Sequence, residues 1–380
     1  MSLILDIKEL VMETADKLIH QSPYLTIFVS FLIGLCFMPL VLTIAKKRSF
    51  VVKPNKRTSH EGAVPNIGGI NIFISFLLTV FMFSYEIISQ LQFSIIGVFI
   101  ILIVGFVDDL IDIKVSWKLA GEITSAFFLI VLSDIRISNL HGFLGILNLS
   151  IPASYLLSFF VFIVIINALN LIDGVDGLAS GLGILYSLFF AIYFTLTDNP
   201  NLAISAYAMV GSLAVFFLYN VFGKKSKIFM GDSGSLLLGY MITLYVFEFC
   251  KLNAFPLAHN IPQYLTMSAA PAVAVCVLSV PLFDTLRVML TRLKKGVSPF
   301  HPDKNHIHHL LLKTGLKHRQ VTFVLLLVSI FFVGLGLLGR NWRIELLVTT
   351  AFGLATALTY ALWRIVDIKS KQTNQTSKID

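Results

Sequence analysis

The residues best suited to chemistry in this sequence are aspartates in the stretches that join apolar segments. Asp173 and Asp176 lie three residues apart within residues 166–181 (INALNLIDGVDGLASG), together with Asn167 and Asn170. On a helical turn this spacing places both carboxylates on one face. Ionisable groups beside lipid-embedded helices are costly and usually mark a functional site. We therefore expect this stretch to bind a ligand, and the alternative is a tight glycine-rich turn with an aspartate cap.

A second group of carboxylates closes an apolar segment. Asp108 and Asp109 are adjacent, and Asp112 follows one helical turn after Asp108. Three carboxylates at a helix C-terminus oppose the helix dipole, so Mg2+ or a cationic side chain would relieve the repulsion. An Asp-Asp pair alone is a weak signal, and a solvated helix end is the alternative.

A third group precedes another apolar segment, in residues 224–235 (KKSKIFMGDSGS). Gly231 and Gly234 permit a close backbone approach, and a helix is expected to begin nearby. Exposed amides at a helix N-terminus suit a phosphate, and Asp232 offers a hard oxygen to Mg2+. Asp232 or Ser233 could also cap the helix, which is compatible with metal binding.

Histidines and basic residues gather in two further loops. Five of the nine histidines lie between Arg292 and Gln320: His301, His306, His308, His309 and His318. No cysteine accompanies them and the spacing matches no standard zinc finger, so contact with a phosphate or sugar is favoured over metal binding or packing. Arg57, in residues 53–60 (KPNKRTSH), has a guanidinium suited to phosphate oxygens, although a plain basic loop explains most lysines around it.

The elements that position these residues are expected to be membrane-spanning helices. The chain of 380 residues is 56% hydrophobic and 13% charged, whereas soluble domains are about 25% charged. Runs of about 20 apolar residues can cross a bilayer. We therefore predict an all-α polytopic membrane protein with about 11 transmembrane helices. Their expected ranges are 24–45, 67–88, 91–110, 117–134, 153–170, 178–197, 202–222, 234–251, 268–291, 321–339 and 344–365.

The ends of the chain differ from this membrane domain. Residues 1–22 have the periodicity of an amphipathic helix near the membrane surface, residues 23–366 form one transmembrane catalytic domain, and residues 367–380 are a polar tail expected to be disordered. The three cysteines, Cys36, Cys250 and Cys276, lie in apolar runs and are expected to be inert thiols.

The distribution of basic residues predicts the orientation. With eleven spans, twenty lysines and arginines fall in one set of loops and five in the other. By the positive-inside rule the N-terminus is outside and the C-terminus is cytoplasmic, which places every polar cluster on the cytoplasmic face. The net charge of +8 then needs no nucleic acid as partner, since no nucleic-acid-binding module accompanies it.

Four motifs together resemble a known family. They are VDD at 107–109, NALNLIDGVDGLA at 167–179, FMGDSGS at 229–235 and HPDKNHIHH at 301–309. The chain resembles the polyprenyl-phosphate N-acetylhexosamine-1-phosphate transferases, from about Lys53 to His309. The histidine loop and the PNKRTSH stretch resemble the WecA branch, whereas the run of adjacent histidines followed by an acidic residue in the MraY branch is absent.

The resemblance implies roles for particular residues at the reacting centre. Asp232 corresponds to the metal-binding aspartate, and Asp108 and Asp109 to an aspartate pair whose first member is proposed to act on the lipid phosphate. Asp173 is implied as a catalytic residue that joins Asp232 and Asp109 around the metal, and Lys118 corresponds to a lysine that contacts phosphate. Since a phosphate monoester is largely ionised at neutral pH, Asp108 is as well explained by positioning a metal or lysine as by acting as a base.

The resemblance also implies residues that bind the nucleotide and sugar. Phe229 is expected to stack on uracil, and the histidine loop is associated with the sugar-phosphate end. The implied nucleotide- and sugar-binding residues are Asn170, Asp176, Asn220, Phe229, His306, His308, His309 and Arg57.

The activity implied is transfer of N-acetylglucosamine-1-phosphate from UDP-GlcNAc to undecaprenyl phosphate, with release of UMP. Mg2+, with Mn2+ as a substitute, would offset the repulsion between two anionic reactants. The implied setting is the bacterial inner membrane and the first membrane step of surface glycan synthesis, of the O-antigen or common-antigen type, by a possible homodimer. Alternatives are another UDP-N-acetylhexosamine, an ion-coupled secondary transporter or an intramembrane aspartyl protease. A transporter predicts mid-span charges and a repeated half, and a protease leaves most of the carboxylates unexplained.

Overall fold

The computed structural model describes residues 23–48, 51–52, 64–83, 92–224, 226–254, 261–297 and 305–376. The chain forms two compact units. Unit 1 comprises Met1–Ile135 and Gly183–Tyr245, and unit 2 comprises Arg136–Leu182 and Val246–Asp380. The unit boundaries fall within two helices, α8 (Leu178–Leu196) and α10 (Gly231–Leu252), so each of these helices contributes to both units.

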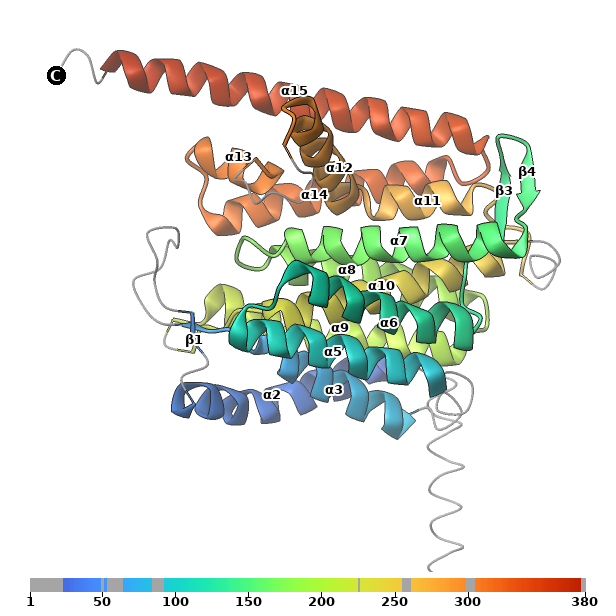
Figure 1. The fold of residues 1–380 in the computed structure, drawn as a ribbon, viewed down its shortest axis with the longest axis horizontal. Coiled ribbons are helices and arrows are strands. Elements are labelled where there is room, and N and C mark those ends of the chain that lie inside the picture. Colours follow the sequence, from blue (N-terminus) through green and yellow to red (C-terminus); the bar gives the residue numbers. More distant parts are fainter. Residues whose placement is uncertain are drawn as a thin grey trace, which may run out of the picture. The chain divides into compact units, whose positions relative to one another are not determined.

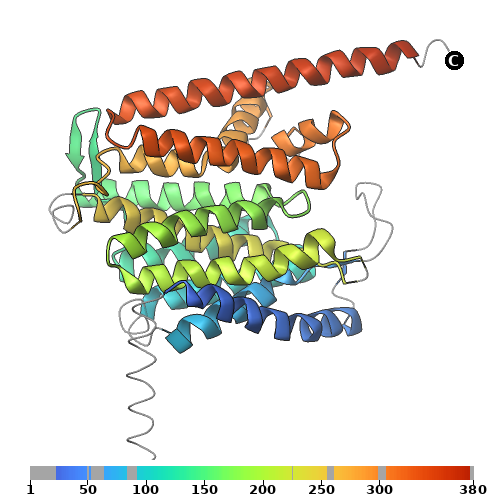
Figure 2. The same ribbon diagram turned by 180° about the vertical axis from the view of Figure 1, so that it is seen from behind.

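Unit 1 is a bundle of helices in which α9 packs against both α2 and α3. Helix α2 packs against α3 and α9, α3 also packs against α9, and α5 packs against α6 (Figures 1 and 2). Besides parts of α8 and α10, its elements are α2 (Leu25–Lys47), β1 (Val51–Val52), β2 (Val64–Pro65), α3 (Gly68–Phe83), α5 (Gln92–Ile111), α6 (Val115–Phe127), the π-helical turn η1 (Phe128–Leu132) and α9 (Pro200–Phe222).

Small residues bring the unit 1 helices into contact. A Cβ on Gly211 of α9 would lie 2.3 Å from the carbonyl oxygen of Ile27 in α2, so only glycine permits this crossing. The hydroxyl of Ser30 in α2 donates to the carbonyl oxygen of Ala208, 2.7 Å away. Close packing of small residues and hydrogen bonds between helices are how membrane helices associate, because lipid offers no hydrophobic driving force between them.

Unit 2 contains a hairpin and six complete helices within the described residues. Strands β3 and β4 pair antiparallel, with Asn139 opposite Asn148. Helix α11 packs along α14, and α13 packs against α15 (Figure 1). The elements are β3 (Asn139–Phe143), β4 (Ile146–Asn148), α7 (Ile151–Leu171), α11 (Ala270–Val277), α12 (Ser279–Lys294), α13 (Ile307–Lys313), α14 (His318–Leu338) and α15 (Ile344–Thr376).

The helices confirm a multi-pass membrane protein. Within the described residues nine helices are long and apolar enough to cross a membrane, or up to ten if one bent pair is a single span. Helix α3 has 16 residues, and residues 84–88, predicted to continue it, lie outside the described part. The predicted count of eleven spans and the orientation of the termini stay predictions.

The predicted span 268–291 is not one straight helix. It is divided into α11 and α12, which meet at 81°. Pro281 explains the break, because proline has no N–H to bond the carbonyl of Val277 four residues earlier and its ring clashes with that carbonyl. Helix α11 therefore ends at Val277, and α12 sets off in a new direction.

Of the two predictions for the ends of the chain, one falls outside the described residues and the other is wrong for most of its length. The amphipathic segment 1–22 lies outside the described residues. Helix α15 runs to Thr376, well into the segment predicted to be disordered. Residues 367–376 contain neither glycine nor proline, so nothing in the sequence stops the helix there.

Candidate active site

Unit 1 holds a carboxylate–lysine cluster formed by Asp108, Asp109, Lys118 and Asp232. Asp108 is near the end of α5, and Lys118 is in the first turn of α6. A tight connection joins these helices at Asp112, which adopts a left-handed φ of 49° that aspartate tolerates better than most residues. The ammonium Nζ of Lys118 lies 3.0 Å from Oδ2 of Asp108 and 2.7 Å from Oδ2 of Asp232. One lysine thus bridges two carboxylates from separate helices.

Asp109 positions the helix that carries Asp232. Its Oδ1 accepts hydrogen bonds from the backbone N–H of Asp232 at 2.7 Å and from Nδ2 of Asn66 at 2.9 Å. Its Oδ2 accepts from the backbone N–H of Ser233 at 3.0 Å. A carboxylate from α5 therefore caps the N-terminus of α10, where its negative charge is also attracted to the positive end of the helix dipole. The same three donors leave few lone pairs on Asp109 for a metal ion.

Glycines allow these elements to approach each other. Gly231 has a φ of +71°, and a Cβ there would lie 2.5 Å from Oδ2 of Asp109. A Cβ on Gly105 would lie 2.6 Å from the carbonyl oxygen of Asp232, and one on Gly69 would lie 2.2 Å from the amide nitrogen of Gly234. The glycines of the FMGDSGS motif therefore serve close backbone contact, as the sequence predicted.

The loop before α10 is fixed on both sides. The buried Asn220 of α9 donates from Nδ2 to the carbonyl oxygen of Ile228 at 2.8 Å. The N–H of Phe229 donates to the carbonyl oxygen of Pro65 at 2.8 Å, and the N–H of Gly68 donates to the carbonyl oxygen of Phe229 at 2.9 Å. The ammonium of Lys227 lies 5.7 Å from the centre of the Phe229 ring. Asn220 thus positions this loop, and the stacking of uracil on Phe229 stays a prediction.

Unit 2 holds a histidine cluster formed by His306, His308 and His309. The rings of His306 and His308 are stacked, with centroids 5.7 Å apart and planes 9° apart, and the centroids of His308 and His309 are 4.2 Å apart. Burial and, to a lesser extent, the neighbouring His309 lower the pKa of His308 to about 3. His308 is therefore neutral at physiological pH.

The histidine cluster lies against the NALNLIDGVDG stretch within unit 2. A Cβ on Gly174 would lie 2.5 Å from Nε2 of His308, so this glycine makes room for the imidazole. Nearby, Oδ2 of Asp176 lies 3.5 Å from Nδ1 of His318, and the hydroxyl of Thr322 donates to the carbonyl oxygen of Asp176 at 2.7 Å. Two motifs more than 120 residues apart in the sequence therefore meet in one unit.

Asn170 and Asp173 occupy the end of α7 and the turn that follows it. The N–H of Asp173 donates to the carbonyl oxygen of Asn170 at 3.3 Å. Gly177 closes the turn with a φ of +76°, a conformation that glycine adopts without strain. Asn170, a predicted nucleotide-binding residue, and Asp173, a predicted catalytic residue, are thus both placed by the C-terminus of one helix.

Asp284 is a buried acidic residue that the sequence reasoning missed. Its Oδ1 accepts from Arg287 at 2.9 Å and from the N–H of Ile307 at 2.8 Å, and its Oδ2 lies 3.0 Å from Nδ1 of His306. The signal was available, because Asp284 and Arg287 lie inside the predicted span 268–291, and ionisable residues within spans mark functional sites by default.

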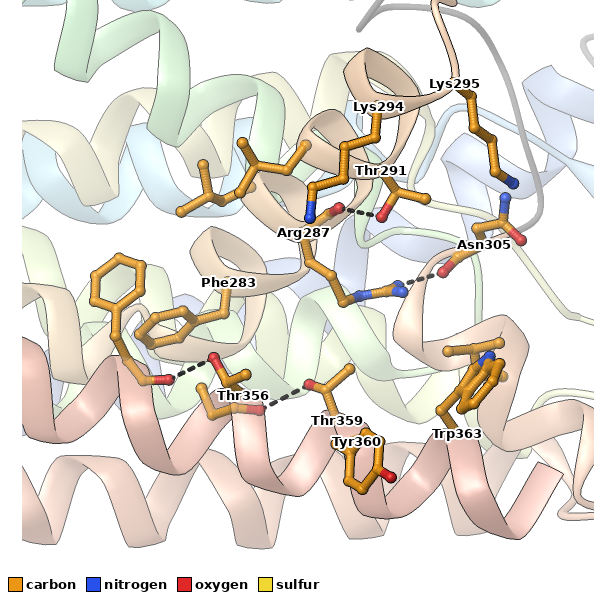
Figure 3. Close-up of a pocket in the computed structure, with 15 residues that line it drawn as sticks. Phe283, Arg287, Thr291, Lys294, Lys295, Asn305, Thr356, Thr359, Tyr360 and Trp363 are labelled. Atoms are coloured by element: carbon orange, nitrogen blue, oxygen red, sulfur yellow. Dashed lines mark hydrogen bonds between the residues drawn. The ribbon is translucent and has the colours of Figure 1, made fainter. Parts of the chain in front are cut away.

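A groove of about 580 Å³ runs between α12 and α15, with Arg287 on its wall (Figure 3). Phe283 and Phe352 meet edge to face in its lining, with ring centroids 4.4 Å apart, whereas Lys294 and Lys295 line its basic part. Figure 3 shows the guanidinium of Arg287 reaching the carbonyl oxygen of Asn305. The groove thus adjoins the residue that supports Asp284.

Some predicted groupings are not settled by this geometry. Asp109 and Asp232 belong to unit 1 and Asp173 to unit 2, so their convergence around one metal ion stays a prediction. Arg57 and His301 lie outside the described residues. Within the described part of the chain, no group of three or more histidine, cysteine or acidic residues is arranged to hold a metal ion.

The carboxylate–lysine cluster nevertheless suits a divalent cation. Oδ2 of Asp108 and Oδ2 of Asp232 both face the position that the ammonium of Lys118 occupies. The donors are hard oxygens, and Mg2+ is usually held by one or two carboxylates together with water and substrate phosphates. The residues therefore fit the ion that the family implies, provided that Lys118 turns toward a phosphate when the ion binds.

Comparison with known proteins identifies relatives over most of the chain. Residues 91–249 match the family described as Glycosyl transferase family 4. The undecaprenyl-phosphate alpha-N-acetylglucosaminyl 1-phosphate transferase of Pasteurella multocida is 30% identical over 325 residues, which cover 84% of this chain and 87% of that protein. The proteins of the same name from Escherichia coli K12 and Salmonella typhi are 28% and 29% identical, and each alignment covers 88% of this chain and 90% of the relative.

Proposed function

This chain belongs to the polyprenyl-phosphate N-acetylhexosamine-1-phosphate transferases, and from that premise we propose that it transfers N-acetylglucosamine-1-phosphate from UDP-GlcNAc to undecaprenyl phosphate. In this reaction an oxygen of the lipid phosphate forms a bond to the β-phosphorus of the nucleotide sugar. The bond from that phosphorus to the oxygen bridging the two phosphates breaks. UMP leaves with the bridging oxygen, and the lipid retains the sugar on a diphosphate.

The observation that carries this proposal is Lys118 held between Asp108 and Asp232. Phosphoryl transfer between two anions depends on positioning and on cations that stabilise the developing charge. Asp232, supported by Asp108, would hold Mg2+, which when bound supplies positive charge to the phosphates of the nucleotide. Lys118 carries a second positive charge at the same place and would contact a phosphate oxygen. Asp109 acts indirectly, because it fixes the backbone of Asp232.

The residues of unit 2 suit the nucleotide and sugar. Asn170 and Asp176 supply an amide and a carboxylate for hydroxyls and the base, and Phe229 of unit 1 offers an aromatic face. The neutral imidazole of His308 packs on Gly174, and it can accept a hydrogen bond from an uncharged group of the sugar or donate one to it. His306 and His309 flank it. Such groups are suited to orienting the uncharged parts of a substrate.

The proposed setting is the bacterial inner membrane, with the site on its cytoplasmic face. The supporting observation is the excess of basic residues in the loops that also carry the motifs. A lipid-linked sugar made there would begin a surface glycan of the O-antigen or common-antigen type.

The direct experiment is to incubate the purified full-length chain, in lipid-containing micelles with Mg2+, with undecaprenyl phosphate and one UDP-sugar at a time. We expect UMP and an undecaprenyl diphosphate N-acetylglucosamine product with UDP-GlcNAc, identified by mass spectrometry. A product formed only with another UDP-N-acetylhexosamine would change the donor. No lipid product with any UDP-sugar would refute the proposal.

A matched pair of lysine variants tests the observation behind it. Lys118→Gln should abolish UMP release, because the phosphates then lose a positive charge. Lys114→Gln should keep it, because Lys114 is exposed and lies outside the cluster. Equal activity in both variants would contradict the role of Lys118.

A further inference from the structure

We infer that Asp284 and Arg287 form a clamp that positions His306 and fixes which of its ring nitrogens carries the proton. The inference rests on the proposed function, since the task of His306 is defined by it. Asp284 was not part of any motif, and within the described residues its side chain bonds to Arg287, His306 and the N–H of Ile307.

The clamp uses two residues from one turn of α12 to hold the three consecutive residues 305–307. Asp284 and Arg287 are at positions i and i+3 of α12, so their side chains lie on the same face. Arg287 donates to the carbonyl oxygen of Asn305 and to Oδ1 of Asp284. The carboxylate in turn receives the N–H of Ile307 and faces Nδ1 of His306. The backbone on both sides of His306 is therefore fixed to α12.

Burial makes this arrangement costly to disturb. The side chain of Asp284 is 1% exposed and that of His306 is 6% exposed. A buried carboxylate that loses a partner keeps its desolvation penalty without the compensating hydrogen bond. Arg287 remains the charge partner of Asp284 even when His306 is neutral, so the clamp does not need a charged histidine.

The contact also selects a tautomer. An ionised carboxylate only accepts hydrogen bonds, so Nδ1 of His306 must be the protonated nitrogen. Nε2 is then left to meet the sugar-phosphate. Fixing one histidine nitrogen through a carboxylate is a general way of orienting a functional imidazole. Asp284 is thus a positioning residue rather than a catalytic one.

A double-mutant cycle separates positioning from a purely structural role. Asp284→Asn should lower kcat/KM about 10- to 100-fold, the usual range for loss of the hydrogen-bond partner of a metal-ligating histidine. Added to His306→Gln, the same change should have little further effect, because the two residues act as one unit. Thr285→Val, a neighbouring buried change in α12, should leave activity unaltered. Additive losses from Asp284→Asn and His306→Gln would overturn the clamp.

A spectroscopic measurement tests the clamp without relying on activity. In protein labelled with 15N-histidine, the His306 signals can be assigned by their loss in His306→Gln. We expect protonated Nδ1 in the wild type and in Asp284→Glu. In Asp284→Asn the amide NH2 would face Nδ1 and shift the proton to Nε2. A wild-type His306 protonated at Nε2, or no change in Asp284→Asn, would refute the clamp.

The two measurements distinguish the clamp from the proposed function. If the wild type transferred no sugar-phosphate, the proposed function would fail, yet the tautomer measurement would still decide the clamp. If the wild type were active while Asp284→Asn retained full activity and its tautomer, only the clamp would fail. Asp284→Glu keeps the carboxylate, so it provides the test should Asp284→Asn fold poorly.

Discussion

The carboxylate–lysine cluster and the histidine cluster differ in their charge: the first brings opposite charges together, and the second keeps its central side chain neutral. In unit 1, side chains of opposite charge converge, with Lys118 between Asp108 and Asp232. In unit 2, the central imidazole of His308 is kept neutral by burial, and the neighbouring His306 faces the deeply buried carboxylate of Asp284. The first arrangement suits phosphates and cations, and the second suits the orientation of uncharged groups.

The two clusters also differ in how they are held together. Unit 1 relies on backbone contacts at glycines, where a Cβ on Gly69 would meet the amide nitrogen of Gly234 at 2.2 Å. Unit 2 relies on side chains, since a Cβ on Gly174 would meet the imidazole of His308 at 2.5 Å. A backbone contact cannot relax without moving a helix, whereas a side chain can turn. We therefore expect unit 1 to tolerate less change.

The largest effect is expected at Asp232. Asp232→Asn should lower kcat at least about 10²- to 10³-fold, because the site loses the carboxylate that would hold Mg2+ and that pairs with Lys118, the two cations that would act on the transferring phosphoryl group. Asp112→Asn is the matched control, since Asp112 is exposed and asparagine tolerates its left-handed backbone. UMP release in micelles measures both variants. Residual activity of Asp232→Asn equal to that of Asp112→Asn would remove the charged cluster from the reaction.

Replacing a glycine by alanine should lower the free energy of unfolding more in unit 1 than in unit 2. Gly69→Ala should cost about 1 to 3 kcal/mol or more, as overpacking does, because α3 must move away from α10. Gly174→Ala should cost less, since His308 can rotate. Gly334→Ala, which would meet nothing within 4 Å, controls for the change in helix propensity. Thermal unfolding in detergent measures the three variants. A larger loss of stability for Gly174→Ala than for Gly69→Ala would contradict the expected difference between the units.

The aromatic face should affect one substrate more than the other. Phe229→Ala should weaken binding of the UDP-sugar by about 1 to 3 kcal/mol, the range for stacking of a base on an aromatic ring. The KM for undecaprenyl phosphate should change less. Phe222→Ala, at an exposed position of α9, serves as the control. A rise confined to the KM for the lipid would place Phe229 elsewhere.

The smallest effect concerns pH and belongs to unit 2 alone. His308 has a pKa of about 3 in the folded chain and an ordinary value near 6.5, so the unfolded chain binds an additional proton between these values. Its contribution to stability is complete above pH 6.5 and is lost as the pH falls toward 3, by at most about 1.4 kcal/mol per pH unit. The charged or titratable groups around it are His306, His309, His318 and Asp284.

His308→Gln tests this effect. The variant should be less sensitive to acid than the wild type when unfolding is followed from neutral pH to about pH 5. The same acid sensitivity in both proteins would show that His308 is already charged in the folded chain.

The sequence predicted residue types more successfully than their arrangement. The VDD and FMGDSGS motifs marked the acidic residues of unit 1, and the structure joins Asp108 and Asp232 through Lys118. The capping of α10 by Asp109 could not be read from the sequence, because it joins residues 123 positions apart. The break between α11 and α12 was signalled by Pro281 but hidden by a continuous apolar run. Asp284 was missed because it lies within that run and belongs to no motif.

The central claim is that Asp108, Lys118 and Asp232 form a place where a divalent cation and a phosphate meet. Mn2+ binding to the purified chain, followed by electron paramagnetic resonance with and without UDP-GlcNAc, tests it most directly. We predict that the wild type and Asp112→Asn bind Mn2+ more tightly when the nucleotide sugar is present, and that Asp232→Asn does not. Unchanged Mn2+ binding in Asp232→Asn would contradict the account.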